Sequence, residues 1–324
     1  MGHDPATRRR VASAIGAALF SPAAFAARGQ NAALDLRHDS PSRLTRRDAE
    51  DYTPPSDLQM VADIYRRMTL AVHVNDAGPF AFVVDTGANQ SVIARELAEQ
   101  LRLPIGPATP LNGVAGVDLA PTTTAKLDLG RRSTPNQAFS LLPRNGIGAD
   151  GMLGLDSIGE AALTIDFVRQ ALRIETGRDN WRDPYAIAVK ATRRDGQLTL
   201  VRVSIGSIPL TAFIDSGAQS TIGNMALRQL ALTRNPTTAW GQTSIISSTG
   251  QTIQAEIADL SDLRVGNLRL PIWPVAFADL HTFQMWNMTS APAILVGVDI
   301  LSRFQSVCLD FWRDEVRFVM PANA

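Results

Sequence analysis

Apolar and polar positions alternate in the same order along two stretches of the chain. In the first half, alternation over 69–74 predicts a half-buried strand, and the apolar run 80–84 predicts a buried strand that ends at Asp85. Residues 75–78, Asn-Asp-Ala-Gly, have the composition of a turn between these strands. Helical spacing of apolar residues over 93–101 predicts the one convincing helix of this half.

The second half repeats this order. A strand-like stretch at 198–205, a turn at 206–207 and an apolar run at 210–214 lead to Asp215, and a short helical stretch follows at 224–232. Self-similarity of this kind indicates an internal duplication, with one structural unit in each half.

Three short motifs also occur twice. The first, DTGANQS at 85–91, matches DSGAQS at 215–220 if one residue is deleted from the second copy. The other pairs are MLGLD at 152–156 with LVGVD at 295–299, and TIDF at 164–167 with CLDF at 308–311.

The spacing between the motifs differs in the two halves. Asp85 and Asp215 are 130 residues apart, whereas Gly154 and Gly297 are 143 apart. The second half therefore carries about 13 additional residues, which we place around 281–288.

The repeated motifs carry a family resemblance. Two copies of apolar-apolar-Asp-(Thr/Ser)-Gly-Ala, each followed by apolar-apolar-Gly, resemble the pepsin-like and retropepsin-like aspartic proteases. Gly-x-Asp-x-(Leu/Ile) and a final Asp-Phe strand resemble the bacterial retropepsin-like group in particular. The resemblance covers about 65–175 and 197–320. It implies a mainly β fold of two homologous six-stranded barrel lobes in a pepsin-like bilobal architecture, with a few short helices.

The chemistry of peptide hydrolysis explains why these residue types are needed. Without a metal, the reaction needs a positioned water, a base that activates it and an acid that protonates the leaving amine. Two carboxyl groups that share one proton can do both, because like charges a few ångströms apart cannot both ionise cheaply. We therefore expect Asp85 and Asp215 to be the catalytic pair, with neither a cofactor nor a metal.

The resemblance also assigns supporting residues. It implies that the Thr86 and Ser216 hydroxyls hydrogen-bond across the two active-site loops, and that Gly87 and Gly217 allow close backbone approach. Gly154 and Gly297 are expected to form a structural floor beneath these loops. The flap candidates, which we expect to bind substrate, are Gly113, Val114 and Gly116 in the first half and Thr249 and Gly250 in the second.

Two features leave alternatives open. Neither candidate flap contains the tyrosine typical of the pepsin-type flap, which favours two retropepsin-like flaps. The segment 281–288 is either a specificity loop beside the cleft or a loop that packs on the surface.

Other titratable residues are expected to be structural. We interpret the repeated aspartates outside the pair as helix caps or strand-end acceptors of backbone N–H groups. His73 is expected to be a partly exposed structural histidine, and Cys308 a small core residue. The repeated aspartates are Asp156, Asp166, Asp299 and Asp310.

The N-terminus has the pattern of a signal peptide. A basic stretch at 8–10 precedes an apolar run at 11–20, and an Ala-x-Ala sequence ends at Ala26. The apolar run is too short to span a bilayer. We expect export to the periplasm or the medium, without stable membrane insertion once the signal is removed. The predicted organisation is a signal peptide at 1–26, a polar leader at 27–59, an N-terminal lobe at 60–175, an inter-lobe linker at 176–196 and a C-terminal lobe at 197–320.

Composition narrows the classes of partner. In 324 residues, 45% are hydrophobic and 31 Lys plus Arg balance 31 Asp plus Glu, which gives no electrostatic case for nucleic acid. One cysteine excludes an internal disulfide framework, and four histidines form no evident metal cluster. The expected partner is a polypeptide substrate, and a monomer suffices because each half supplies one aspartate.

Two other readings remain. The chain could be a catalytically silent binding or scaffold protein that keeps the protease fold. Actin-like phosphotransferases also repeat Asp-x-Gly with a hydroxyl residue, but they need larger, helix-rich halves and an adenosine-binding glycine segment, neither of which the sequence shows.

Overall fold

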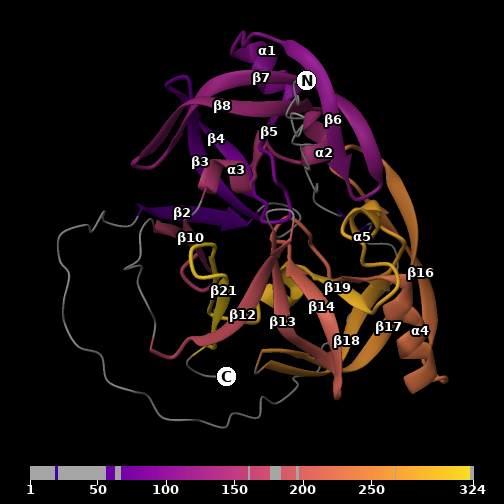
Figure 1. Cartoon of the computed structure of the whole chain (residues 1–324). Coiled ribbons are helices and arrows are strands. Elements are labelled where there is room, and N and C mark those ends of the chain that lie inside the picture. The colour runs from indigo at the N-terminus through magenta and orange to yellow at the C-terminus, as the bar shows by residue number, and fades with distance from the viewer. Residues whose placement is uncertain are drawn as a thin grey trace, which may run out of the picture.

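The computed structural model describes residues 19–20, 56–62, 67–159, 161–175, 184–194, 197–266 and 268–321. The predicted signal peptide, apart from 19–20, and the predicted leader up to residue 55 lie outside the described residues. Two β lobes stand one above the other in Figure 1, the first in indigo and magenta and the second in orange, and a further sheet lies beside their junction.

Each lobe is a closed barrel of six strands. In the first lobe the ring runs β3, β4, β9, β5, β8, β7 and back to β3. In the second lobe it runs β13, β14, β19, β15, β18, β17 and back to β13. The expected mainly β fold of two six-stranded lobes is confirmed.

The elements of the first lobe are β3 (Met68–Val74), β4 (Ala77–Val84), β5 (Val92–Ala94), α1 (Arg95–Gln100), β6 (Gly106–Gly113), β7 (Gly116–Leu129), β8 (Arg132–Leu142), α2 (Arg144–Ile147), β9 (Gly151–Leu153) and α3 (Leu155–Ile158). Those of the second lobe are β13 (Gln197–Ile205), β14 (Ile208–Ile214), β15 (Ile222–Gly223), α4 (Met225–Arg234), β16 (Trp240–Ile246), β17 (Thr252–Val265), β18 (Leu268–Phe277), α5 (His281–Met285), β19 (Ala293–Val296) and α6 (Val298–Leu301). A two-stranded pairing joins β1 (Leu19–Phe20) to β16.

An antiparallel sheet joins the lobes. Its strand order is β2, β11, β10, β20, β21, β12, so equivalent strands of the two halves, β10 and β20, meet at its centre. The outer strands continue into the barrels, because β2 also pairs with β3 and β12 with β13. The elements are β2 (Ser56–Ala62), β10 (Ala162–Asp166), β11 (Ala171–Glu175), β12 (Ile187–Arg194), β20 (Ser306–Asp310) and β21 (Glu315–Val319).

This sheet departs from the sequence-based expectation at two places. Part of the segment 176–196, which we expected to be loop, forms β12, and the predicted leader already enters β2 at Ser56. The segments 27–59 and 176–196 are polar overall, so composition alone did not separate the strand-forming residues within them from loop. The predicted helices form at the expected positions, but their lengths differ from the prediction. The helix α1 begins only at Arg95, because Val92–Ala94 pair in β5.

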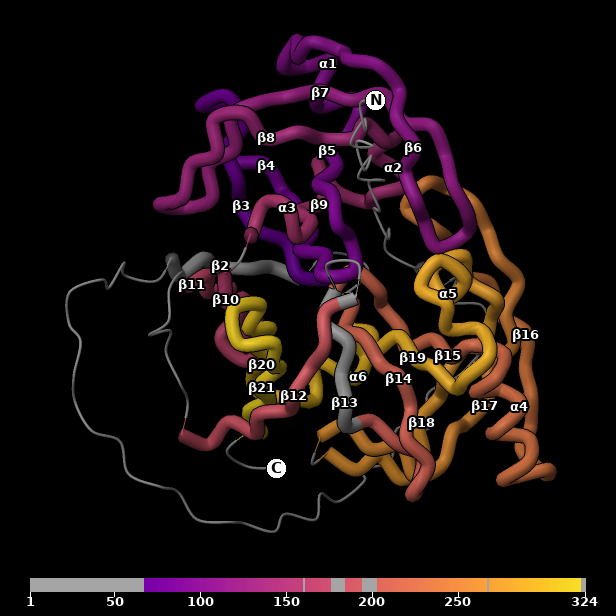
Figure 2. Tube along the Cα trace, viewed as in Figure 1, coloured from indigo at the N-terminus to yellow at the C-terminus, as the bar shows by residue number. Residues whose placement is uncertain are grey.

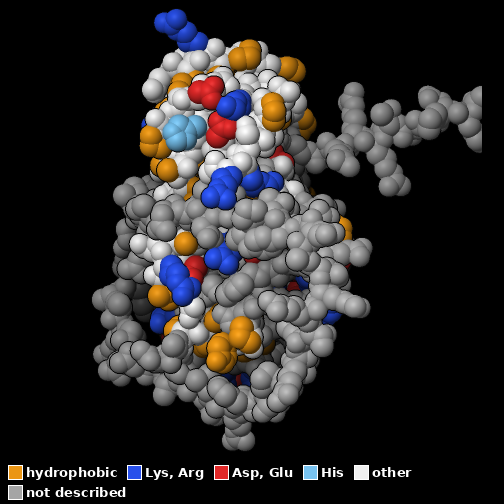
Figure 3. All heavy atoms as spheres, turned by 90° about the vertical axis from the view of Figure 1, so that its left-hand side faces the viewer, with side chains coloured by type: hydrophobic (Ala, Val, Ile, Leu, Met, Phe, Trp, Pro, Cys, Tyr) orange, Lys and Arg blue, Asp and Glu red, His pale blue; other side chains and the backbone are white. Residues whose placement is uncertain are grey.

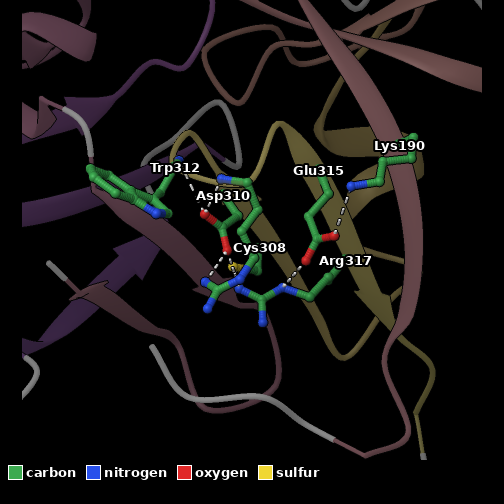
Figure 4. A network of polar contacts seen from close by, with 7 residues as sticks. Lys190, Cys308, Asp310, Trp312, Glu315 and Arg317 are labelled. Atoms are coloured by element: carbon green, nitrogen blue, oxygen red, sulfur yellow. Dashed lines mark hydrogen bonds and ion pairs between the residues drawn. The ribbon is translucent and has the colours of Figure 1, made fainter. Parts of the chain in front are cut away.

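Buried polar contacts hold the end of β20 (Figure 4). The Asp310 side chain is fully buried, and Arg313 and Arg317 approach its Oδ2 at 3.0 and 2.9 Å. Its Oδ1 accepts hydrogen bonds from the backbone N–H groups of Trp312 and Arg313, and Asp166 does the same in the first half for Val168 and Arg169. Both aspartates are therefore strand-end acceptors, as expected. Cys308 is buried in the same sheet, which raises the pKa of its thiol.

The structure corrects the alignment of the two active-site loops. Ser91 Oγ accepts the N–H of Gly154 at 3.0 Å, and Thr221 Oγ1 accepts that of Gly297 at 3.1 Å. Ser91 and Thr221 are 130 residues apart, as are Asp85 and Asp215, so the predicted deletion in the second copy is wrong. Both loops have to span the same gap between equivalent barrel strands, which fixes their length.

The additional residues of the second half fall in two places. Ser140 and Ala276 are equivalent residues, because they pair with the equivalent residues Val92 and Ile222, and their numbers differ by 136. Further along the chain, the equivalent residues Gly151 and Ile294 differ by 143. Seven of the additional residues therefore lie between β18 and β19, around α5, where we expected all of them. The other six lie earlier, between β15 and β18.

The core is divided in the same way as the sheets. One apolar cluster fills each barrel, and Leu155 and Phe167 pack against both clusters. A third cluster lies under α5 on the outer face of β14. On the face drawn in Figure 3, acidic and basic side chains lie next to each other. Within the described ranges, no helix is long and apolar enough to cross a membrane.

Candidate active site

Asp85 and Asp215 occupy equivalent positions at the ends of two buried strands. Asp85 follows β4 and its N–H donates to Leu153 O at 3.0 Å, while Asp215 follows β14 and donates to Val296 O at 3.1 Å. The tube view in Figure 2 shows both strands running to the junction of the lobes. Both side chains are fully buried. The structure thus brings the two predicted aspartates, 130 residues apart in sequence, to one place.

Backbone N–H groups fix one oxygen of each carboxyl group. Asp85 Oδ1 accepts hydrogen bonds from Gly87 N at 2.8 Å and Ala88 N at 3.1 Å. Asp215 Oδ1 accepts from Gly217 N at 2.9 Å and Ala218 N at 3.0 Å. Because each loop chelates its own aspartate, both side chains are held in one orientation.

The two loops are joined by reciprocal hydrogen bonds. Thr86 Oγ1 accepts the N–H of Ser216 at 3.0 Å and donates to Ile214 O at 3.0 Å. Ser216 Oγ accepts the N–H of Thr86 at 3.1 Å and donates to Val84 O at 2.8 Å. All four bonds are buried and each spans the two lobes. The arrangement implied by the resemblance for Thr86 and Ser216 is therefore present.

The glycine that follows Thr86 and the glycine that follows Ser216 each leave room for the carboxyl group of the opposite lobe. A Cβ on Gly87 would lie 2.6 Å from Asp215 Oδ2, and one on Gly217 would lie 2.5 Å from Asp85 Oδ2. Any side chain at either position would displace the carboxyl group of the opposite lobe. Gly87 and Gly217 are thus required for the approach of the two aspartates, as expected.

The environment favours one shared proton on this pair. Asp85 Oδ2 and Asp215 Oδ2 are buried, and no backbone N–H, side-chain N–H or hydroxyl group among the described residues donates to them, so each has only the other carboxyl group to share a proton with. Burial, followed by the charge and hydrogen bond of Asp215, raises the pKa of Asp85 well above its ordinary value. Burial also raises the pKa of Asp215 to about 6. The two carboxyl groups therefore titrate as one unit that keeps a single proton between them.

A buried cation, which no sequence pattern indicates, lies near the pair. Arg67 is fully buried just before β3, and its Nη2 donates to Ile147 O at 2.7 Å. Its charge lowers the pKa of both aspartates, but less than burial raises them. Buried arginines are rare, but one arginine beside a strand carries no pattern that could have marked it.

The predicted flap residues lie at the tips of two hairpins. Gly113, Val114 and Gly116 form the turn between β6 and β7, and Thr249 and Gly250 lie in the turn between β16 and β17. A Cβ on Gly113 would lie 3.3 Å from Ser247 Oγ, so the hairpins of the two lobes meet at their tips. Figure 1 shows them approaching from above and below beside α5.

The predicted floor residues are closely packed against the active-site loops. A Cβ on Gly154 would lie 2.9 Å from Ala88 O, and one on Gly297 would lie 3.0 Å from Ala218 O. The aspartates that follow them are structural, as expected. Asp156 accepts from Ser91 Oγ and Gln137 Nε2, whereas Asp299 accepts from Thr221 and Trp273 Nε1. Neither belongs to the pair.

Two residues that the sequence analysis did not single out support the loops. Ser91 and Thr221 each link the floor glycine to the following aspartate. An ungapped alignment of the two repeats pairs these hydroxyl residues and would have revealed them. Among the described residues, no cluster of three or more His, Cys, Asp or Glu side chains could hold a metal ion.

Comparison with known families agrees with this geometry. A model described as gag-polyprotein putative aspartyl protease matches residues 70–160, and a model described as aspartyl protease matches residues 201–300. The two matches are in tandem, and each contains one Asp-(Thr/Ser)-Gly loop. A search of curated proteins found no significant match. With one such domain in each barrel, the chain belongs to the retropepsin-like aspartyl proteases and carries two repeats in a single polypeptide.

Proposed function

We propose that the protein is an aspartic endopeptidase in which Asp85 and Asp215 activate the water that hydrolyses the peptide bond. One observation carries the proposal: each lobe supplies one buried carboxyl group, and the Thr86–Ser216 hydrogen bonds lock the two loops together. A buried carboxyl pair with raised pKa values and no structural partner on its outer oxygens is typical of a catalytic acid–base site.

The reaction follows from the one proton that the pair shares, which we propose Asp85 holds at the start. Ionised Asp215 takes a proton from the water as its oxygen attacks the peptide carbonyl carbon, and Asp85 gives its proton to the carbonyl oxygen. The resulting gem-diol collapses when the C–N bond breaks. Asp215 gives its proton to the leaving amine, and Asp85 regains one from the diol hydroxyl. One water is consumed, and the pair ends with one proton, as it began.

The substrate is proposed to be a polypeptide outside the cytoplasm. The signal-peptide pattern at 1–26 supports export, and it supports a target in the cell envelope or the medium. Because one chain supplies both aspartates, we propose that the monomer is active. The two β barrels are unlike the helix-rich halves that a phosphotransferase of the actin type needs.

A peptide library tests the proposal directly. The mature chain, incubated with proteome-derived peptides at several pH values, is expected to cut internal peptide bonds, which mass spectrometry of the products detects. New termini within peptides would identify an endopeptidase. No cleavage at any pH would contradict the proposal and favour a silent scaffold with the protease fold.

A further inference from the structure

One hairpin tip is buried in the opposite lobe. We call the β6–β7 hairpin flap 1 and the β16–β17 hairpin flap 2. Val114, at the tip of flap 1, is fully buried in the apolar cluster under α5, together with Phe213, Phe283 and Trp286 of the second lobe. Val117, three residues further along flap 1, is 54% exposed. Residues 111–114 are all buried, and at the tip Val114 adds an apolar side chain to the cluster of the second lobe.

Polar contacts from α5 reinforce this anchor. His281 N donates to Val114 O at 2.9 Å, and His281 Nε2 lies 3.4 Å from Asn112 Oδ1. Asn112 is itself buried. His281 begins α5, which lies in the connection between β18 and β19 that contains seven of the additional residues of the second half. The longer connection therefore gives the second lobe a docking site for flap 1.

Flap 2 meets the first lobe differently. Its tip, Ser-Ser-Thr-Gly at 247–250, is buried at Ser247 and Ser248 but has no apolar side chain, and the Ser247 and Thr249 hydroxyls bond to each other at 2.8 Å. It touches α2 at Gly146, where the absence of a Cβ leaves room for the Ser248 carbonyl. Among the described residues, no hydrogen bond joins this tip to the first lobe.

Substrate entry requires this closed arrangement to open. With both hairpin tips in contact, Asp85 and Asp215 are fully buried, so a polypeptide cannot reach them. We propose that flap 1 is latched to α5 and stays in place, and that flap 2 is the moving flap through which the polypeptide enters. This inference rests on the proposed peptidase function only for what passes through the opening.

Hydrogen exchange of the mature chain without substrate tests the latch. Backbone amides open at rates that follow local stability. Peptides that cover 111–117 are expected to exchange at least about tenfold more slowly than those that cover 246–252. Equal rates, or faster exchange in flap 1, would overturn the proposal.

A matched pair of variants separates the anchor from the hairpin. Val114→Ser is expected to remove the protection of 111–117, whereas Val117→Ser, the same change at an exposed position, leaves it unchanged. Unchanged protection in Val114→Ser would overturn the latch. Hydrogen exchange in β10 and β20 reports whether either variant destabilises the whole fold. If Val114→Ser does destabilise it, the comparison of flap 1 with flap 2 in the unsubstituted chain decides whether flap 1 is latched.

The two proposals fail separately. Exchange is measured without cleavage, so an inactive protein can still show a latched flap 1. Conversely, cleavage that depends on Asp85 and Asp215 would stand even if both flaps exchanged at the same rate.

Discussion

Replacement of either aspartate by asparagine is expected to abolish cleavage. In Asp215→Asn the base is lost, and in Asp85→Asn the proton donor is lost, while the amide keeps the size of the carboxyl group. General acid–base catalysis by one positioned group contributes roughly 10²–10⁴-fold, and here each group performs two proton transfers. We therefore expect kcat/KM for a library-derived peptide to fall by about 10⁴-fold or more in each variant. Full activity in either variant would contradict the assignment.

The same variants should remain folded, and their stability provides the control. The folded pKa of Asp215 is raised to about 6 from an ordinary value of 3.8, so the folded state binds more protons than the unfolded state between these values. Its contribution to the free energy of unfolding is present below 3.8 and is lost as the pH rises through 6. Asp215→Asn should therefore gain stability relative to the unsubstituted chain between pH 4 and 7, measured by urea unfolding.

Loss of the hydroxyl lock is expected to cause the second large effect. Thr86→Val keeps the shape of the side chain but leaves the buried Ser216 N–H and Ile214 carbonyl without their partners. Each unsatisfied buried group costs about 1–3 kcal/mol, so we expect the free energy of unfolding to fall by roughly 2–6 kcal/mol. Because the lock joins the lobes, kcat/KM should fall as well.

Three further variants make the test specific to the lock. Ser216→Ala should cost a similar amount, and the double variant should cost less than the sum, since both changes break one network. Thr192→Val, at an exposed position of β12, should change stability by less than about 0.5 kcal/mol. Additive losses in the double variant would show that Thr86 and Ser216 act independently.

The duplicated pattern made the fold and the aspartate pair predictable. The apolar runs that end at Asp85 and Asp215 form barrel strands that are buried where they approach the aspartates. A strand that is buried on both faces has a continuous apolar sequence. The glycines could be assigned because only they allow a carboxyl group of the other lobe to pack against the loop. Features that depend on backbone geometry could therefore be predicted from the hydrophobic periodicity and the sequence repeats.

Features that depend on contacts between the lobes were not predictable. Nothing in the local sequence of Val114 indicates that it inserts under α5, because its partners Phe213 and Phe283 lie more than ninety residues away. The sequence of 281–288 favours neither a specificity loop nor a surface loop, and the structure shows α5 in contact with the tip of flap 1. Arg67 and the strand β12 were missed for the same reason, since only tertiary packing gives them their place.

The pH dependence of kcat/KM tests the central claim most directly, because it reports the protonation of the free enzyme. One shared proton predicts a bell-shaped profile. Both limbs belong to the pair as one unit, and because burial raises the pKa of both aspartates, both limbs should lie above the ordinary carboxyl pKa of 3.8. A profile with a single limb at an ordinary carboxyl pKa would contradict the account, because the two aspartates would then titrate independently.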